Sequence, residues 1–392
     1  MGVTFRCGVE VGKNVTIQEL REQGFKAFFL AIGLQGGRKA GVPGEEGQGV
    51  ESGVDFLYRV NNDPTEKLTG DVVVVGGGNV AADVARTALR ATDGKVTMLC
   101  LESREQMPAA KDEVEEVLAE GIVVKNGWGP KEVQRDADGT VTGVVFKRCT
   151  RVFDEQNRFN PQYDENFTLT VPCSNVLMAI GQSAQWGDLL KDTKVEVRRN
   201  GTAVCDPVTL QTAEPDVFVA GDICHGAKFA IDAIADGREA MVSINRFVHP
   251  GQSLTIGRDR REFIEFDRED ITRPESFDNS PRQRPGMKPG EARETFRDLR
   301  LPLTEEQVKI EANRCLGCGA TTVDFNKCVG CGLCTTRCEF DALHLTRDMP
   351  AASDMHTAEE MMKLVGPYAL KRMGKIVKRK LTGKGDYPSE QE

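Results

Sequence analysis

The feature that most constrains the fold is a run of four valines, residues 72–75, that leads directly into three glycines, residues 76–78. Four consecutive β-branched residues are typical of a strand that is buried on both faces of a parallel sheet. Gly76, Gly78 and Ala81 then follow at the spacing G-x-G-x-x-A, and an alanine-rich helical segment comes next. In this spacing the first glycine permits a tight turn, the second lets a pyrophosphate approach the backbone, and the alanine allows close packing of helix and strand. The order strand, turn, helix therefore predicts a Rossmann-like α/β unit that binds a dinucleotide at the helix N-terminus.

Length and charge limit the classes of protein that remain. The 392 residues suffice for two or three domains with cores of their own. A formal net charge of −9 argues against a nucleic-acid partner. We find no apolar run of membrane length and no secretory signal pattern, so we expect no integral membrane segment and a cytoplasmic protein.

Hydrophobic patterning predicts the other elements around this unit. Strands are expected at 95–101, 122–125, 141–147 and 167–171, and a helix at 111–120. Two further buried strands, within 25–33 and 176–181, both end in Ala-Ile-Gly, and a third, 216–222, ends in Gly-Asp and precedes a helix at 228–247. Residues 251–303 are rich in proline and in charges of both signs, which indicates a linker or a segment wrapped over a surface.

Six of the twelve cysteines lie within residues 315–338, after a short helix expected at 304–313. Cys328, Cys331, Cys334 and Cys338 follow the spacing C-x₂-C-x₂-C-x₃-C, which is typical of a [4Fe–4S] cluster. Gly330 and Gly332 lie between them and let backbone N–H groups point at the cluster sulfurs. We therefore predict an iron–sulfur centre in this segment.

The number of metal centres stays open, because six cysteines exceed one cluster and fall short of two. Cys315 and Cys318 form a further C-x-x-C, and a second centre on Cys315, Cys318 and Cys338 would need a non-cysteine ligand or a ligand from a partner. Together with Cys328 and Cys331 they also match a four-cysteine zinc site, which is the alternative. That alternative leaves Cys334 and Cys338 unused.

Three motifs resemble those of the glutamate synthase small subunit family: GGGNVAADVAR at 76–86, SREQMPA at 103–109 and VAGD at 219–222. The resemblance covers about residues 1–250. It implies a flavin enzyme with one FAD-binding and one NAD(P)-binding Rossmann-like domain, the second inserted in the first. A small ferredoxin-like iron–sulfur domain would follow. The implied domains are 1–70 with 179–250 for FAD, 71–178 for NAD(P), 251–303 as charged linker, 304–350 for the cluster, and 351–392 as a basic tail.

The resemblance also implies where the cofactors bind. Both Ala-Ile-Gly segments would lie at the junction of the two domains, and Asp222 would hold the FAD ribityl chain, with Gly221 allowing a close approach. The family has its own flavin-binding G-x-G-x-x-G on a first strand, and this sequence contains no such motif, so we expect an incomplete FAD domain. Three explanations stay open: a partner chain completes the domain, the sequence is a fragment, or the flavin is absent. The candidate cofactor residues are Gly76, Gly78, Asn79, Val80, Ala81, Glu102, Ser103, Arg104, Ala31, Ile32, Gly33, Ala179, Ile180, Gly181, Gly221 and Asp222.

The residue that ends the second strand of a Rossmann unit contacts the adenosine ribose. Glu102 occupies this position, and a carboxylate accepts hydrogen bonds from the two ribose hydroxyls and repels a 2′-phosphate. NADPH-dependent members of the resembled family carry an arginine pair where this chain has Leu101 and Glu102. We therefore expect NAD(H) in preference to NADP(H), although Arg104 stands close enough in sequence to reach a phosphate.

The sequence predicts an electron-transfer oxidoreductase subunit that connects NAD(H), FAD and a [4Fe–4S] centre. Its partners would be other redox subunits and a ferredoxin or similar carrier, in an arrangement that also suits an electron-bifurcating complex. One alternative is a glutamate synthase small subunit proper. The other is a structural or electron-wire subunit without flavin. Cys224 is expected to be buried or next to the flavin and not to act as a nucleophile.

Overall fold

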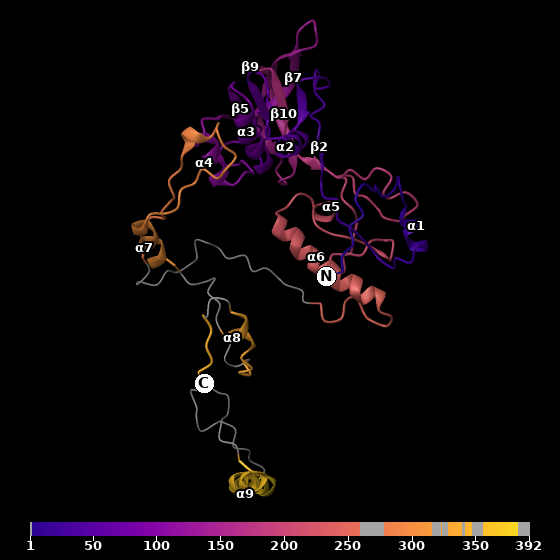
Figure 1. Ribbon diagram of the computed structural model, residues 1–392, viewed down its shortest axis with the longest axis vertical. Coiled ribbons are helices and arrows are strands. Elements are labelled where there is room, and N and C mark those ends of the chain that lie inside the picture. Colours follow the sequence, from indigo (N-terminus) through magenta and orange to yellow (C-terminus); the bar gives the residue numbers. More distant parts are fainter. Residues whose placement is uncertain are drawn as a thin grey trace. The chain divides into compact units, whose positions relative to one another are not determined.

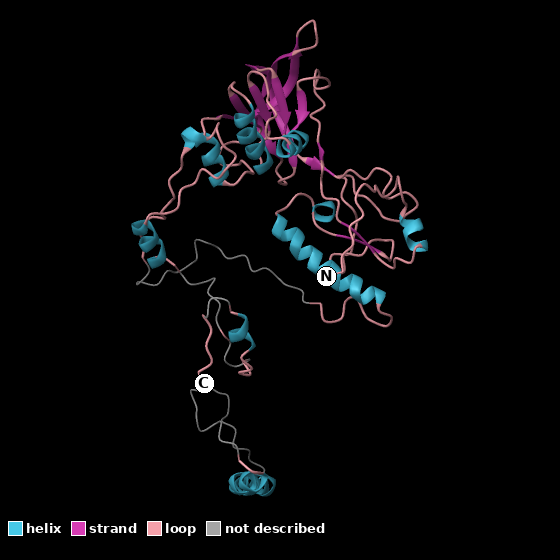
Figure 2. Ribbon diagram, in the orientation of Figure 1, coloured by secondary structure: helices cyan, strands magenta, loops and turns pink. Residues whose placement is uncertain are grey.

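A computed structural model of the chain describes residues 2–258, 278–315, 323, 328–338, 342–346 and 356–382. The chain divides into two compact units, Met1–Arg314 and Cys315–Glu392, and each is described by itself. The first unit holds all the strands among the described residues (Figure 2).

The centre of the first unit is a five-stranded parallel sheet with the order β3-β10-β4-β5-β6 (Figure 1). Its strands are β3 (Val50–Ser52), β4 (Val72–Val75), β5 (Val96–Cys100), β6 (Val123–Asn126) and β10 (Asn175–Met178). All four valines of β4 are buried, which confirms the strand predicted from the valine run. Other elements cover both faces of this parallel sheet, so a central strand such as β4 needs apolar side chains on both faces.

Helices cover one face of this sheet, and a three-stranded antiparallel meander packs on the other. Val72 and Val74 pack with the helices, while Val73 and Val75 pack with the meander. The helices are α2 (Gly53–Asn62), α3 (Asn79–Ala91) and α4 (Lys111–Ala119). The meander consists of β7 (Trp128–Arg135), β8 (Val141–Phe153) and β9 (Phe159–Pro172).

The meander is where the sequence-based strand predictions were least complete. The pattern missed β7 and gave only part of β8 and β9. Register shifts interrupt the pairing of both strand pairs, and β9 is mostly exposed. Strict alternation of apolar and polar residues is lost under those conditions, so the hydrophobic pattern shows only the best-packed stretches.

A second region of the same unit is built around two parallel strands, β1 (Phe28–Leu30) and β12 (Val217–Val219). Their buried side chains pack with Ile17 and Ile223 into a small core. The helices of this region are α1 (Ile17–Glu22), α5 (Asp222–His225) and α6 (Ala230–Val248). Two short strands, β2 (Gly36–Gly37) and β11 (Gln182–Ser183), pair with each other between this region and the five-stranded sheet.

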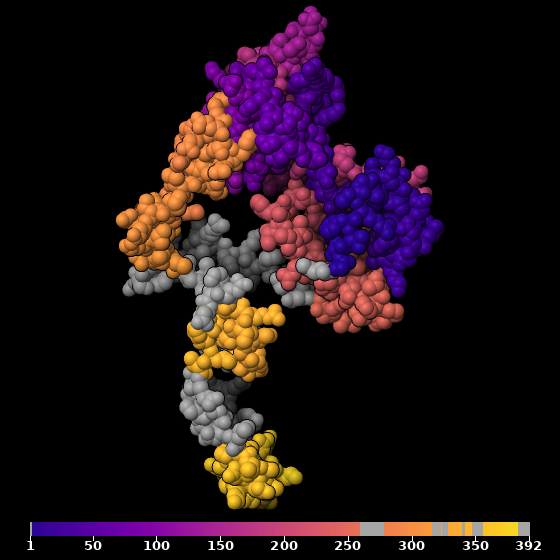
Figure 3. Space-filling model, viewed as in Figure 1, coloured from indigo at the N-terminus to yellow at the C-terminus, as the bar shows by residue number. Residues whose placement is uncertain are grey.

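Part of the segment expected as a linker packs on the helical face of the sheet. We call residues 286–301 the strap; it contains the 3₁₀ helix η1 (Pro289–Glu291). Ala292 and Leu299 of the strap are buried in the same core as α3 and α4. In Figure 3 the orange atoms of this segment lie against the purple atoms of the sheet region. Helix α7 (Glu305–Asn313) follows, and Thr304 caps it.

Polar contacts of two arginines hold the strap in place. Arg293 donates from Nη1 to the carbonyl oxygen of Thr92 at 2.6 Å and from Nη2 to that of Gly94 at 2.9 Å. Arg90 in α3 donates in return to the carbonyl oxygen of Thr295 at 2.7 Å. Arg293 Nη1 also lies 3.4 Å from the carbonyl oxygen of Leu89, which is one of the last carbonyls of α3. Because such carbonyls lack partners within the helix, this donor satisfies a group that would otherwise need water.

The second unit contains α8 (Leu333–Arg337) and α9 (Ala358–Thr382) among its described residues. Hydrophobic residues of α9 such as Leu370 and Met373 are exposed, and its second half carries lysine and arginine without any acid. Within the described parts of the chain, we find no helix that is both long and apolar enough to cross a membrane.

Candidate functional site

The three glycines after β4 have different surroundings, which explain why each position is a glycine. A Cβ atom on Gly76 would lie 2.3 Å from the carbonyl oxygen of Ala179, and its φ of +148° also disfavours a side chain. A Cβ atom on Gly78 would meet nothing within 4 Å. Gly76 is thus required by packing, whereas Gly78 faces open space into which a ligand can approach.

Gly78 is also the N-cap of α3, and it has no side chain that could satisfy the first N–H groups of the helix. Uncapped N–H groups together with the helix dipole favour an anion at this end. Asn79 accepts a hydrogen bond at Oδ1 from the backbone N–H of Ala110 at 2.8 Å and so ties the loop after β5 to the glycine turn. The arrangement suits the pyrophosphate of a dinucleotide.

Glu102 lies beside this turn. Its Oε2 atom is 2.7 Å from the position a Cβ of Gly77 would take, so the carboxylate lies over the glycines. The carbonyl of Glu102 accepts hydrogen bonds from the Gly127 N–H and from Nδ2 of Asn126, both at 3.1 Å, which fix the strand end. Burial, followed by the nearby Glu102 charge, raises the pKa of Cys100 to about 12, so this neighbouring thiol stays protonated.

The glycine turn and Glu102 line one side of a cleft of about 1190 Å³. Of the predicted cofactor residues, those that line this cleft are Gly76, Gly78, Asn79, Val80, Glu102, Ala179, Ile180 and Gly181. Ala81 is buried where α3 approaches the sheet. Ser103 and Arg104 lie on the adjoining loop and do not line the cleft, and Arg104 is exposed.

The opposite wall of the cleft comes from the meander, which the sequence analysis did not connect with binding. Trp128, Lys147 and Tyr163 line it. The Lys147 ammonium lies 4.3 Å from the centre of the Tyr163 ring, a cation–π contact. Gly129 makes room for this wall, because a Cβ atom there would lie 2.5 Å from Tyr163 and 2.8 Å from Leu101.

A second cavity of about 360 Å³ opens at the carboxyl ends of β1 and β12. Ala31, Gly33, Gly221 and Asp222 line it, whereas Ile32 packs into the core beneath. The carboxyl ends of parallel strands are where α/β folds bind ligands. Asp222 accepts a hydrogen bond at Oδ1 from the Lys228 N–H at 3.2 Å.

The two segments that end in Ala-Ile-Gly lie side by side in the structure. Beyond them, Gly36 pairs with Ser183 in the short β2–β11 ladder. Arg38 donates from its backbone N–H to the carbonyl oxygen of Gly181 at 3.1 Å. Each glycine has a positive φ, +64° at Gly33 and +119° at Gly181, where the chain turns from one region into the other.

Of the predicted cluster ligands, Cys315, Cys328, Cys331, Cys334 and Cys338 are among the described residues, and Cys318 lies outside them. Gly330 and Gly332 both adopt positive φ, +67° and +73°, which fits a loop that turns its N–H groups inward. Cys338 Sγ accepts a hydrogen bond from the Ala342 N–H at 3.3 Å. Over the described residues, no three His, Cys, Asp or Glu side chains gather as a metal set. The donor set and the glycine geometry nevertheless fit a [4Fe–4S] cluster.

Comparison with known protein families gives two matches. Residues 3–237 match the pyridine nucleotide-disulphide oxidoreductase model, and residues 321–344 match a 4Fe-4S binding domain. These matches confirm a chain that binds flavin and pyridine nucleotide and carries a [4Fe–4S] segment. They leave the choice between NAD and NADP, and the number of metal centres, open.

Three relatives are similar to most of this chain but are matched over only about half of their own length. The beta subunit of an NADP(+)-dependent formate dehydrogenase from Moorella thermoacetica is 35% identical over 81% of this chain and 46% of its own length. The beta subunit of an NADPH-Fe(3+) oxidoreductase from Geobacter sulfurreducens is 27% identical over 81% and 52%. The glutamate synthase [NADPH] small chain of Escherichia coli is 29% identical over 61% and 54%.

The chain thus spans about half the length of these relatives. The resemblance to the glutamate synthase small subunit family is confirmed, and so is the expectation of a redox enzyme subunit. Because the matched family model covers more than half of the residues, the chain belongs to the pyridine nucleotide-disulphide oxidoreductase family.

Proposed function

We propose that this chain is an electron-transfer subunit in which bound nicotinamide, flavin and [4Fe–4S] groups together convert hydride transfer into single-electron transfer to a partner. The observation that carries the proposal is the uncapped α3 N-terminus at Gly78, which opens into a cleft shared with the junction residues Ala179 and Gly181. A nucleotide held there by its pyrophosphate would extend toward the flavin-binding region.

The work of the protein side chains in this scheme is positioning. The α3 N–H groups would hold the pyrophosphate, Glu102 would orient the ribose, and Asp222 would hold the flavin ribityl chain. No side-chain base is required, because the cofactors carry the chemistry and the protein supplies orientation and exclusion of water.

The preferred nucleotide is proposed to be NADH. Glu102 places a carboxylate over the glycine turn, where a 2′-phosphate would meet repulsion at close range. All three relatives named above carry NADP or NADPH in their names, so the proposal sets this chain apart from them and rests on Leu101 and Glu102 in place of an arginine pair.

We further propose that another βαβ unit completes the flavin-binding region, either on a partner chain or elsewhere on the same polypeptide. Its support is an exposed apolar surface next to the candidate flavin cavity: Phe29, Phe229, Ile231 and Ile234 are 40%, 68%, 69% and 59% exposed. Contiguous exposed apolar side chains of this kind mark a surface that another element covers.

The partners are proposed to be other redox subunits and a ferredoxin or similar carrier. A cytoplasmic location is proposed as well, because six clustered cysteines must stay reduced to bind iron. One experiment tests the core proposal. The native complex is titrated with NADH without oxygen, while flavin absorbance and the electron paramagnetic resonance of the cluster are followed.

Reduction of both groups is the expected result. Flavin reduction with an unchanged cluster would contradict the electron path. Absence of bound flavin would favour the structural, electron-wire alternative. Glutamine-dependent formation of glutamate would favour a glutamate synthase small subunit proper.

A further inference from the structure

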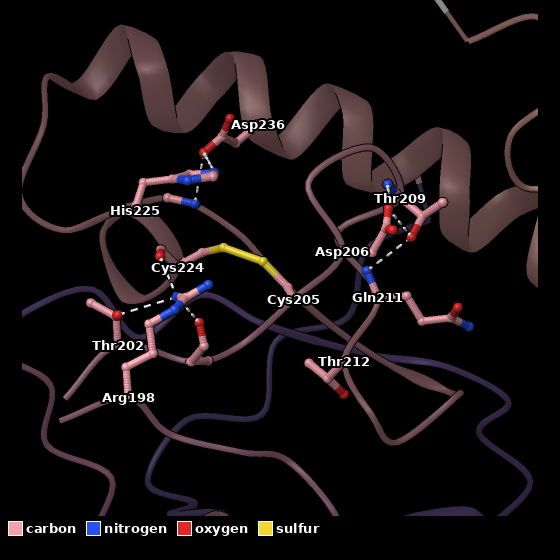
Figure 4. The surroundings of a disulfide bond; sticks show 12 residues. Arg198, Thr202, Cys205, Asp206, Thr209, Gln211, Thr212, Cys224, His225 and Asp236 are labelled. Atoms are coloured by element: carbon pink, nitrogen blue, oxygen red, sulfur yellow. Dashed lines mark hydrogen bonds and ion pairs between the residues drawn. A yellow bond between two sulfur atoms is a disulfide. The ribbon is translucent and has the colours of Figure 1, made fainter. Parts of the chain in front are cut away.

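A disulfide joins two cysteines at the turn that carries Asp222. Cys224 lies in α5, two residues after Asp222, and its sulfur is bonded to that of Cys205 in a preceding loop (Figure 4). Cys224 is buried, as expected from the sequence, whereas Cys205 is partly exposed. The spacing of the two cysteines, 19 residues apart, gave no sign of a pair.

One side of this turn is held by α6. Asp236 Oδ2 accepts a hydrogen bond from the Gly221 N–H at 3.0 Å and lies 3.3 Å from Nε2 of His225. Figure 4 shows the imidazole of His225 directed toward Asp236. These contacts tie both ends of α5 to the long helix.

The other side of the turn is held by the loop that contains Cys205. The Ala203 N–H donates to the carbonyl oxygen of Ile223 at 2.7 Å. Arg198 donates from Nη1 to the carbonyl oxygen of Cys224 at 3.1 Å and also bonds that of Ala203. The disulfide is the covalent member of this second set.

We propose that Cys205 and Cys224 form a redox latch, a thiol–disulfide pair whose state sets how tightly the Gly221–Asp222 turn is held. A dithiol reductant would attack the accessible Cys205 sulfur, and the Cys224 sulfur would leave as a thiol. A second thiol of the reductant then releases Cys205. The S–S bond is exchanged for two protein thiols, and the reductant leaves with its own disulfide, so two electrons and two protons have moved to the protein.

Reduction of the disulfide affects the Gly221–Asp222 turn because neighbouring segments hold the backbone of this turn in place. Gly221 has a φ of +66° and donates its N–H to α6, while Asp222 lines the candidate flavin cavity. Without the disulfide, non-covalent contacts alone hold α5 to the Cys205 loop: the hydrogen bonds and the packing of Ile223 with Ala203. We therefore expect α5 to open more often. The consequence for ligands rests on the proposed function: the flavin would leave faster from the reduced protein.

The first test asks whether the bond exists. The full chain, purified without reductant, is unfolded in urea and alkylated with iodoacetamide before and after dithiothreitol. Cys100 and Cys173 are the matched controls, because both are buried and free of disulfides. We expect both controls to be labelled before dithiothreitol, and Cys205 and Cys224 only after it. Labelling of Cys205 and Cys224 in the unreduced sample would overturn the proposal.

The second test measures the turn itself by amide hydrogen exchange over residues 221–226, a readout that needs no flavin. Dithiothreitol should raise exchange in the wild type several-fold and leave Cys205→Ser, already at the higher rate, unchanged. Cys173→Ser should respond as the wild type does. Equal exchange in oxidised and reduced wild type would refute the latch. FAD release from the native complex, measured in parallel, shows separately whether the flavin assignment holds.

Discussion

At the residue scale, the structure separates glycines that the packing requires from the one that a ligand would require. A Cβ on Gly76 collides with the backbone at Ala179, and a Cβ on Gly77 collides with Glu102 and Cys100. Gly78 has open space and a φ of −92°, which any residue can adopt. Nothing within the described residues requires a glycine at position 78. A pyrophosphate bound at this turn would require one, because it would occupy the space of a side chain.

This difference predicts opposite results for two similar variants. Gly78→Ala should leave thermal stability unchanged and lower affinity for the nucleotide roughly tenfold, because a methyl group would occupy the path of the pyrophosphate. Gly76→Ala should instead lower the melting temperature, since backbone atoms at 2.3 Å cannot move aside. Calorimetric titration with NADH and thermal unfolding measure the two effects. If the Gly78→Ala protein bound NADH as tightly as the wild type, the proposal that the pyrophosphate binds at this turn would be wrong.

A second prediction at this scale concerns the nucleotide preference. Changing Leu101 and Glu102 together to arginine should shift kcat/KM toward NADPH by about tenfold or more, because charge-assisted hydrogen bonds replace a repelling carboxylate. The control is Glu105→Arg, which adds positive charge to the same loop outside the cleft. Comparable kcat/KM for NADH and NADPH in the native protein would count against Glu102 as the selective residue.

At the element scale, the strap connects helix α3, the proposed nucleotide-binding helix, with the segment that leads to the cysteines. Helix α3 would hold a pyrophosphate at its N-terminus, and its C-terminal end receives the two hydrogen bonds of Arg293. Positive charge at a helix C-terminus is favourable. The strap thus attaches the chain ahead of α7 to the same element that would bind the nucleotide.

Arg293→Ala should release the strap while the sheet region stays folded. The loss of two charge-assisted hydrogen bonds is expected to cost about 1–2 kcal/mol, since part of the site is exposed to water. Protease cleavage within residues 286–301 should then become several-fold faster. Arg297→Ala is the matched control, because Arg293 and Arg297 are both exposed and, among the described residues, the Arg297 side chain makes no hydrogen bond or ion pair. Equal cleavage of the two variants would mean that Arg293 does not hold the strap.

The cluster segment is the second element with a test of its own. Cys331→Ser should lower iron and acid-labile sulfide sharply and leave the melting of the first unit unchanged, because the cysteines lie in a separate compact unit. Cys7→Ser, a change at an exposed cysteine outside the motif, is the control. Stoichiometric zinc without iron in the wild type would establish the zinc alternative in place of the cluster.

At the scale of the whole molecule, the two β-regions differ in how completely they are covered. The five-stranded sheet has helices on one face and the meander on the other. In the region of β1 and β12, where we propose that flavin binds, β12 pairs with β1 on one side and with residues 210–212 on the other, and Phe229, Ile231 and Ile234 are exposed nearby. Among the described residues the outer edge of β1 has no strand beside it, and an open edge of this kind pairs readily with another chain.

The expected outcome is that this chain, expressed alone, binds FAD weakly or associates with itself. Addition of a unit with a G-x-G-x-x-G strand, turn and helix should restore both a defined size and flavin binding. Light scattering and FAD titration measure the two properties. A monomer that binds stoichiometric FAD without any added unit would disprove the completed-domain proposal.

Local sequence was enough to predict the valine strand, the glycine turn after it, Glu102 at the end of the second strand and the iron–sulfur segment. Each of these predictions depends on residues that are close together in the chain. Contacts between distant segments could not be inferred in this way. The wall formed by Lys147 and Tyr163, the attachment of Arg293 to α3 and the Cys205–Cys224 bond all join residues whose separation in sequence carries no pattern. Their positions follow from packing of the whole first unit, where the free energy of burial decides which segments meet.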